Sequence, residues 1–167
     1  MGTPRVYIET TLFNFYFAQS RGQYYGKTVE YCKDTRRFFE VLETGDFEPY
    51  TSRYVTEEIE EHGNADQRRE MLKLMADCGV TILPADERAE RLAAQYVQAG
   101  AIPETQMDDA LHIAMTAVHG LDFIVSLNFR HIVKGKAIRL TAMVNEAEGY
   151  DRIGIYEPGE VLGYGTA

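Results

Sequence analysis

The 167-residue chain lacks the features that mark secreted, membrane-spanning or disulfide-stabilised proteins. It has no stretch of about 18 apolar residues, which excludes a typical transmembrane helix. Its first residues lack the charged-then-apolar layout of a signal peptide, so we expect a cytoplasmic protein. The only two cysteines, Cys32 and Cys78, lie far apart, which argues against a zinc site or a disulfide framework. We expect both to be buried thiols.

Basic residues are also scarce. There are 17 lysines and arginines against 26 acidic residues, giving a formal net charge of −9. This charge excludes a protein that coats nucleic acid without selectivity. It does not exclude a nuclease, because a site that collects carboxylates around a metal ion is itself acidic. The sequence has no internal repeat, low-complexity tract or long linker, so residues 1–167 are predicted to form one domain.

Short apolar runs alternate with stretches of helical periodicity. The predicted strands are Arg5–Ile8, Val80–Leu83 and Phe123–Val125, with a further candidate strand at Arg152–Tyr156. A short segment at Phe47–Thr51, not assigned to a strand or a helix, leads to Ser52. Helical patterns lie near residues 12–17, 28–43, 52–61, 65–77, 86–99, 105–119 and 138–146. This alternation predicts a three-layer α/β/α fold with a mainly parallel central sheet. Such sheets bind ligands at the carboxyl ends of their strands.

Glu58 is the acidic residue that is hardest to explain as ordinary surface. On a helix spanning residues 54–62, Tyr54, Val55 and Ile59 define the apolar arc. Glu58 falls inside that arc, and a carboxylate that faces a core is costly unless it is paired or coordinated. A buried salt bridge, or a side chain reaching solvent at the end of a short helix, is the alternative to a functional role.

Asp109 is the second candidate. Thr105 and Asp108 fit a capping box, with Thr105 as the N-cap and Asp108 returning to its backbone N–H. That leaves Asp109 without a structural task on a helix that is apolar almost all round. Its place in the first, positively polarised turn would explain a carboxylate equally well. His112 shares the narrow polar arc with Asp109 and has no identifiable partner.

Two further polar residues follow predicted strands. Glu9 ends the first strand, and Asn128 comes just after the fourth. Taken alone, Glu9 is more simply an acid at the end of a strand, and Asn128 a turn residue. Together with Glu58 and Asp109, however, they can converge on one edge of a parallel sheet. Three carboxylates and an amide oxygen are hard ligands that suit Mg²⁺ or Mn²⁺.

Four segments, in order, resemble the motifs of PIN-domain proteins, in a bacterial and archaeal branch related to VapC-type toxins. The segments are Tyr7–Phe17, Thr51–Ile59, Asp109–Ala114 and Ile124–Val133. The resemblance implies a PIN fold and a Mg²⁺- or Mn²⁺-dependent endoribonuclease. In it, Glu9, Glu58 and Asp109 would be metal ligands, and Asn128 a fourth catalytic residue. Two positions depart from the usual aspartates of the family, because Glu9 has a longer side chain and Asn128 lacks the charge.

The resemblance also implies a mechanism and partners. The reaction would be hydrolysis of RNA by a metal-activated water. The densest basic run lies at the end of the fourth motif, and its members Arg130, His131 and Lys134 are candidate contacts to the RNA backbone. Lys136 and Arg139 extend the run, and a plain solvated face is the alternative. A homodimer and an antitoxin protein are the expected protein partners, and no membrane is involved.

Two other functions fit part of the pattern. A weakly active or inactive PIN-fold protein that binds RNA or a protein partner is favoured by Glu9, Asn128 and the net charge of −9. A phosphatase of the haloacid-dehalogenase type would also place an acid after the first strand of a parallel sheet. That class requires an aspartate nucleophile, usually as DxD, and the run Glu9-Thr10-Thr11 lacks it.

Overall fold

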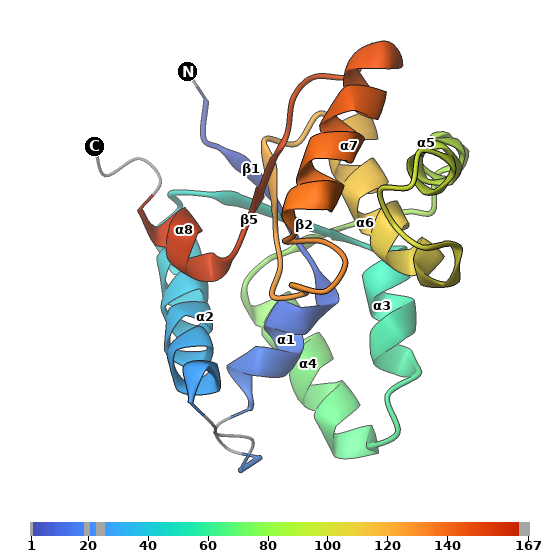
Figure 1. Ribbon diagram of the computed structural model, residues 1–167. Helices are drawn as coiled ribbons and strands as arrows, with labels where there is room; N and C mark the ends of the chain where they lie inside the picture. The colour runs from blue at the N-terminus through green and yellow to red at the C-terminus, as the bar shows by residue number, and fades with distance from the viewer. Residues whose placement is uncertain (1, 19–20, 23–25, 164–167) are drawn as a thin grey trace.

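The computed structural model describes residues 2–18, 21–22 and 26–163 (Figure 1). The strands in this part form a five-stranded sheet of order β3-β2-β1-β4-β5, in which every neighbouring pair is parallel. The strands are β1 (Arg5–Ile8), β2 (Glu48–Ser52), β3 (Thr81–Leu83), β4 (Phe123–Val125) and β5 (Gly154–Tyr156). The α/β class and the parallel sheet predicted from the alternation are confirmed.

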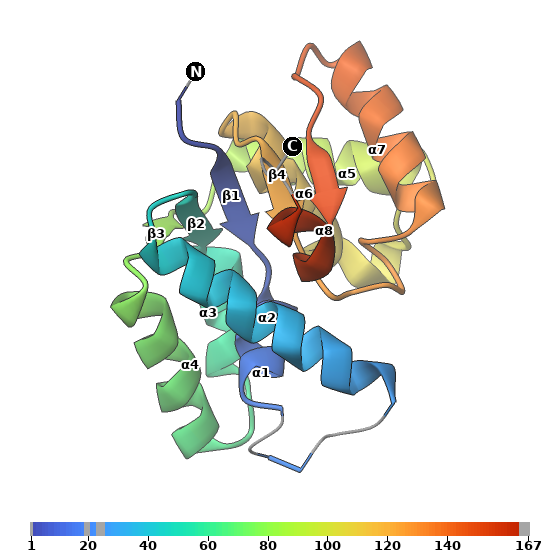
Figure 2. The same cartoon turned by 90° about the vertical axis from the view of Figure 1, so that its left-hand side faces the viewer.

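Helices connect the strands and cover the sheet. Within the described residues they are α1 (Thr10–Tyr16), α2 (Lys27–Glu43), α3 (Arg53–Glu60), α4 (Ala65–Asp77), α5 (Glu87–Gln98), the 3₁₀ helix η1 (Glu104–Gln106), α6 (Met107–Val118), α7 (Gly135–Ala147) and α8 (Pro158–Leu162). Figures 1 and 2 show α2 and α8 on one face of the sheet, with α3, α5 and α6 on the other. The arrangement has three layers, α/β/α.

β1 lies at the centre of the sheet because it is apolar on both faces. Val6, Tyr7 and Ile8 are fully buried, as expected for a parallel strand between two helical layers. The register sets Ile8 beside Val125, and the backbone N–H of Glu9 donates to the carbonyl of Val125 over 3.1 Å. The chain that leaves β1 therefore starts next to the chain that leaves β4.

The capping box predicted at Thr105 and Asp108 is wrong. Pro103 has an extended backbone, with φ −61° and ψ 146°, and η1 follows it directly, so Thr105 lies inside that turn. The residue before α6 is Gln106, which makes no side-chain capping hydrogen bond. Asp108 is exposed, whereas Asp109 is buried. The first turn of α6 thus directs one of two adjacent acids into the protein.

Two expectations from composition can be compared with the fold. Neither Cys32 nor Cys78 forms a disulfide in the described part of the chain. Cys32 is buried as predicted, but Cys78 is partly exposed because it follows the last turn of α4. No helix among the described residues has both the length and the apolar character needed to cross a membrane.

Candidate acidic site at the carboxyl edge of the sheet

A hollow of about 190 Å³ lies at the carboxyl ends of the central strands. Its wall includes all four residues singled out from the sequence: Glu9, Glu58, Asp109 and Asn128. They come from the end of β1, from α3, from the first turn of α6 and from the loop after β4. The parallel topology brings these distant parts of the chain to one edge of the sheet, where α/β proteins bind ligands.

Glu9 joins the ends of β1 and β4. Its side chain is 2% exposed. The carboxylate oxygen Oε1 accepts hydrogen bonds from the backbone N–H of Thr11 (3.2 Å), from Thr11 Oγ1 (2.5 Å) and from Ser126 Oγ (2.6 Å). Glu9 is therefore the N-cap of α1 and also a link to the loop that carries Asn128.

The surroundings of Glu9 oppose its negative charge. Burial raises the pKa of Glu9 above its ordinary value, and the charge of Glu58 raises it further. His112 and the hydroxyls of Ser126 and Thr11 lower the pKa and offset part of this effect. An ionised Glu9 is thus held at an energetic cost that a nearby cation would reduce.

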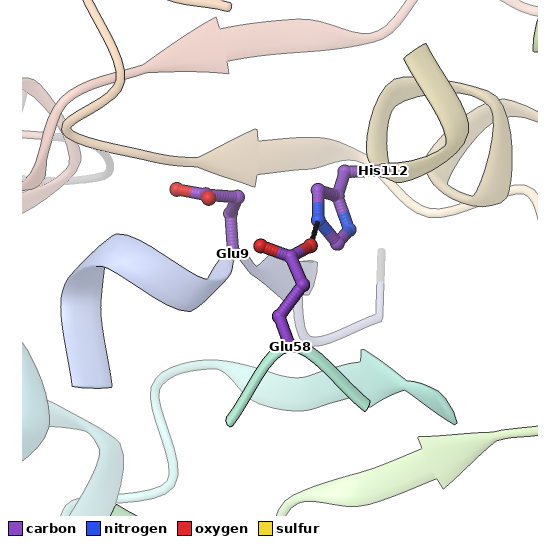
Figure 3. Close-up of side chains that lie close together, drawn as sticks. All are labelled: Glu9, Glu58 and His112. Atoms are coloured by element: carbon purple, nitrogen blue, oxygen red, sulfur yellow. Dashed lines mark hydrogen bonds and ion pairs between the residues drawn. The ribbon is translucent and has the colours of Figure 1, made fainter. Parts of the chain in front are cut away.

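Glu58 lies at the boundary between the core and the hollow. The arc predicted for α3 is correct, because Val55 and Ile59 are buried, while the side chain of Glu58 is 28% exposed. Glu58 Oε1 forms a short hydrogen bond with Nε2 of His112 (Figure 3). The carboxylate is therefore paired, and it still contributes to the wall of the hollow.

A chain of buried polar groups continues from His112, on the other nitrogen of its ring. His112 Nδ1 lies 2.7 Å from the hydroxyl of Tyr7, and that hydroxyl lies 2.6 Å from Ser52 Oγ. The hydrogen-bonded chain runs from the end of β2 through β1 and α6 to Glu58. Burial lowers the pKa of His112, but the hydrogen bond and charge of Glu58, followed by Glu9 and Asp109, raise it above its ordinary value.

Glu9, Glu58 and His112 form the tightest cluster of metal-ligating side chains in the described residues. Their nearest candidate ligand atoms lie within 4.8 Å of one another. Both ring nitrogens of His112 are engaged, one with Tyr7 and one with Glu58. A ligating imidazole must present a free lone pair to the metal. We therefore assign His112 to holding Glu58, and the two carboxylates to facing a ligand.

Asp109 and Asn128 complete the wall. Asp109 is 8% exposed, and burial raises its pKa, while His112, Asn128 and His131 lower it in part. The Asn128 oxygen Oδ1 accepts the backbone N–H of His131 over 3.0 Å. The amide oxygen is thus engaged in the turn after β4, and the remaining amide nitrogen is the group that can interact with Asp109.

The sequence did not identify the partners of His112. Tyr7 looked like an ordinary core residue of a buried strand, and Ser52 like a simple N-cap, which it also is, for α3. The contacts to His112 span 105 residues from Tyr7 and 54 residues from Glu58. The one available signal was a histidine on a helix that is buried from Asp109 to Ala117, since such a residue needs hydrogen-bond partners.

The basic run after β4 lies beside the site. Arg130, His131, Lys134 and Lys136 line a second hollow of about 200 Å³. Arg139 is separate from it and lines a groove along α7. His131 lines the second hollow and also affects the first, because its backbone N–H donates to Asn128 and its charge lowers the pKa of Asp109.

The ligand groups of the site are carboxylate oxygens, which suit a hard divalent cation such as Mg²⁺ or Mn²⁺. The raised pKa values of Glu9 and Asp109 fit the same conclusion, because bound positive charge would relieve the cost of keeping them ionised. The chain matches no protein-family model. It also matches no curated protein. The geometry and chemistry of the hollow are therefore the basis for assigning a function.

Proposed function

We propose that the protein is a PIN-type endoribonuclease that hydrolyses phosphodiester bonds of RNA with Mg²⁺ or Mn²⁺. The observation that carries the proposal is the convergence of Glu9, Glu58 and Asp109 on one hollow beside Asn128. The order of the four sequence motifs and the three-layer fold support the PIN assignment. A bound divalent ion would supply Lewis-acid stabilisation of the negative charge that develops on the phosphate.

The residues of the site divide the remaining tasks. Glu9 and Asp109 would hold the cation, because both are buried carboxylates with raised pKa values. Glu58 would complete the acidic wall and orient the attacking water through its exposed edge. His112 fixes the rotamer of Glu58 through its hydrogen bond. Asn128 would hold the turn after β4 through its bond to the His131 N–H and position a water or the phosphate in the hollow.

The substrate strand would approach from the side of the basic run. Arg130, His131 and Lys134 line the second hollow, next to the loop of Asn128. These side chains can contact phosphates without reading the bases. In a protein with a net charge of −9, such a local basic surface is where an RNA backbone would be held. The cytoplasmic location, the homodimer and the antitoxin partner stay predictions from the sequence.

Cleavage of single-stranded RNA, labelled at its 5′ end, tests the proposal. We expect cleavage with Mn²⁺, none with EDTA, and a loss of at least about 100-fold in Asp109→Asn, by analogy with removing other charged catalytic groups. Asp108→Asn is the matched control, because Asp108 is the exposed neighbour of Asp109.

Two outcomes would contradict the proposal. Cleavage that persists in EDTA, or that is equal in the wild type and Asp109→Asn, would point to a contaminating nuclease or to different chemistry. RNA binding without any cleavage in Mn²⁺ would favour the alternative of a PIN-fold binding module.

A further inference from the structure

Asn14 and His62 line the hollow together with the carboxylates. Asn14 belongs to α1, and His62 follows the end of α3. Each side chain has one group that donates a hydrogen bond and one that accepts, if the imidazole is neutral. What the hollow presents to a ligand therefore depends on which group of each residue is already held elsewhere.

A partly buried arginine, Arg21, fixes the orientation of Asn14. Arg21 Nη1 donates to Asn14 Oδ1 over 2.6 Å, and the Arg21 side chain is only 9% exposed. A guanidinium has donors and no acceptor, so the oxygen of Asn14 must face it and the NH₂ group must face away. No residue in the described chain accepts a hydrogen bond from Asn14 Nδ2, and Asn14 as a whole is partly exposed.

A backbone N–H likewise determines which ring nitrogen of His62 carries the proton. The N–H of Asn64 donates to His62 Nδ1 over 3.3 Å. In the neutral ring, the proton is then on Nε2, which is the second donor at the hollow. Thr10 adds a third polar group to this wall, because its hydroxyl is buried and has no hydrogen-bond partner in the described part of the chain.

Donors at this place do not serve a bare cation, because a divalent ion is ligated by oxygen acceptors. A bare anion does not fit either, since Glu9, Glu58 and Asp109 would repel it. The combination fits a cation and an oxyanion bound together, with the carboxylates holding the first and the N–H groups the second. We propose that Asn14 and His62 bind the non-bridging oxygens of a substrate phosphodiester, with Arg21 as the positioning residue for Asn14. This inference rests on the proposed function.

One substitution tests the NH₂ group of Asn14 as a donor. Asn14→Asp keeps the size of the side chain and the oxygen that faces Arg21, with which it would form an ion pair. It replaces the NH₂ group in the hollow by an acceptor. His62→Ala removes the second donor at a partly exposed position, and circular dichroism checks that the variant is folded. Ala94→Glu is the charge control, because Ala94 is exposed on α5, away from the hollow.

The experiment measures two affinities of each variant. Mn²⁺ binding is followed by the electron paramagnetic resonance signal of the free ion. Binding of a fluorescent, 2′-O-methyl RNA strand is followed by anisotropy in Mn²⁺ and in EDTA, and a gel checks that the strand stays intact. In Mn²⁺, we expect Asn14→Asp and His62→Ala each to bind the strand about tenfold more weakly, the usual cost of one charge-assisted hydrogen bond. Their Mn²⁺ affinity should stay at least as high as one third of the wild-type value.

The outcomes separate this inference from the proposed function. If Asn14→Asp and Ala94→Glu bind the strand with equal affinity, the roles of Asn14 and His62 are overturned. A wild type that binds Mn²⁺ but does not bind the strand would overturn them as well. A wild type that binds no Mn²⁺ would overturn the proposed function instead. In that case strand binding measured in EDTA tests the roles of Asn14 and His62 without a metal. These roles are upheld only if Asn14→Asp binds the strand more weakly than the wild type does.

Discussion

The carboxylates of the protein occupy two contrasting environments. Asp86 caps α5, accepting the backbone N–H of Arg88, and its Oδ2 pairs with Arg88 Nη2 over 2.8 Å. The hydrogen bonds of Arg88 lower the pKa of Asp86 to about 2. In the hollow, burial raises the pKa of Glu9 and of Asp109 instead.

The difference is between a charge that serves the fold and charges that the proposed function assigns to a bound cation. The negative charge of Asp86 is satisfied by a cation of the protein itself, so its ionised form stabilises the native state. The ionised forms of Glu9 and Asp109 are disfavoured in the folded protein, and the charge of His112 compensates them only in part. Carboxylates whose charge the protein compensates only in part are candidates for a functional site.

The largest expected effect is the response of the hollow to a cation. Mn²⁺ at about 100 times its Kd should stabilise the protein by about 2.7 kcal/mol, or about 5–10 °C in Tm for a chain of this size. Glu58→Gln should lose most of this shift, because it removes one charge from the acidic wall. Differential scanning fluorimetry at several Mn²⁺ concentrations measures both.

Glu57→Gln provides the control for this prediction. Glu57 is on the same helix, and its side chain is 49% exposed in an ion pair with Arg53. The shift in Tm should be unchanged in this variant. Equal shifts in Glu57→Gln and Glu58→Gln would mean that Mn²⁺ binds somewhere other than the hollow, and the contrast between the two environments would lose its functional meaning.

A smaller effect is expected from the chain of buried groups behind Glu58. Tyr7→Phe leaves His112 Nδ1 and Ser52 Oγ without their shared partner, which should cost about 1–3 kcal/mol in urea denaturation. Because His112 then holds Glu58 less firmly, Mn²⁺ affinity should fall by about tenfold. Tyr96→Phe is the matched variant, since the buried hydroxyl of Tyr96 bonds to Asn145 away from the hollow.

Tyr96→Phe should lower stability to a similar extent and leave Mn²⁺ affinity unchanged. Parallel losses of metal affinity in the two tyrosine variants would show that general destabilisation, and not the support of Glu58, weakens metal binding.

The smallest expected effects are changes in the unfolding free energy, and they should have opposite signs in Asp86→Asn and Asp109→Asn. Asp86→Asn should lower the unfolding free energy at pH 7 by about 1 kcal/mol or less, the usual range for such pairs. The pKa of Asp86 is lowered in the folded state, so this loss should fade as the pH falls from 3.8 through about 2. Without metal, Asp109→Asn should raise the unfolding free energy at pH 7.

The pKa of Asp109 is raised in the folded state, so the gain in Asp109→Asn should shrink as the pH falls through that raised value towards 3.8. Urea denaturation of both variants and the wild type over this pH range measures the two trends. A destabilised Asp109→Asn would indicate that its carboxylate serves the fold, as Asp86 does.

Much of the fold was predictable because local patterns carry it. The continuous apolar runs at Arg5–Ile8 and Phe123–Val125 identified the central strands, and Ser52 and Asp86 marked the starts of α3 and α5. The start of α6 was not predictable from a cap signature. Pro103 and the 3₁₀ turn set the path of the chain there, and their effect depends on tertiary packing.

The site was predictable in part for the same reason. Glu9 and Asn128 follow strands, and Glu58 interrupts an apolar arc, so local sequence places each of them at the carboxyl edge. The pairing of Glu58 with His112 and Tyr7 crosses three elements, and the orientation of Asn14 depends on Arg21. Such contacts depend on the completed fold, and no pattern within a single helix or strand encodes them.

The pairing of β1 with β4 has a consequence for protein synthesis. Glu9 and Glu58 leave the ribosome early, but their partners Ser126 and His112 are made in the second half of the chain. Contacts between residues so distant in sequence form slowly and only after the later segment has emerged. A nascent chain therefore carries these acidic groups before the residues that align them have been made, and the site of the proposed nuclease can form only once most of the chain has emerged.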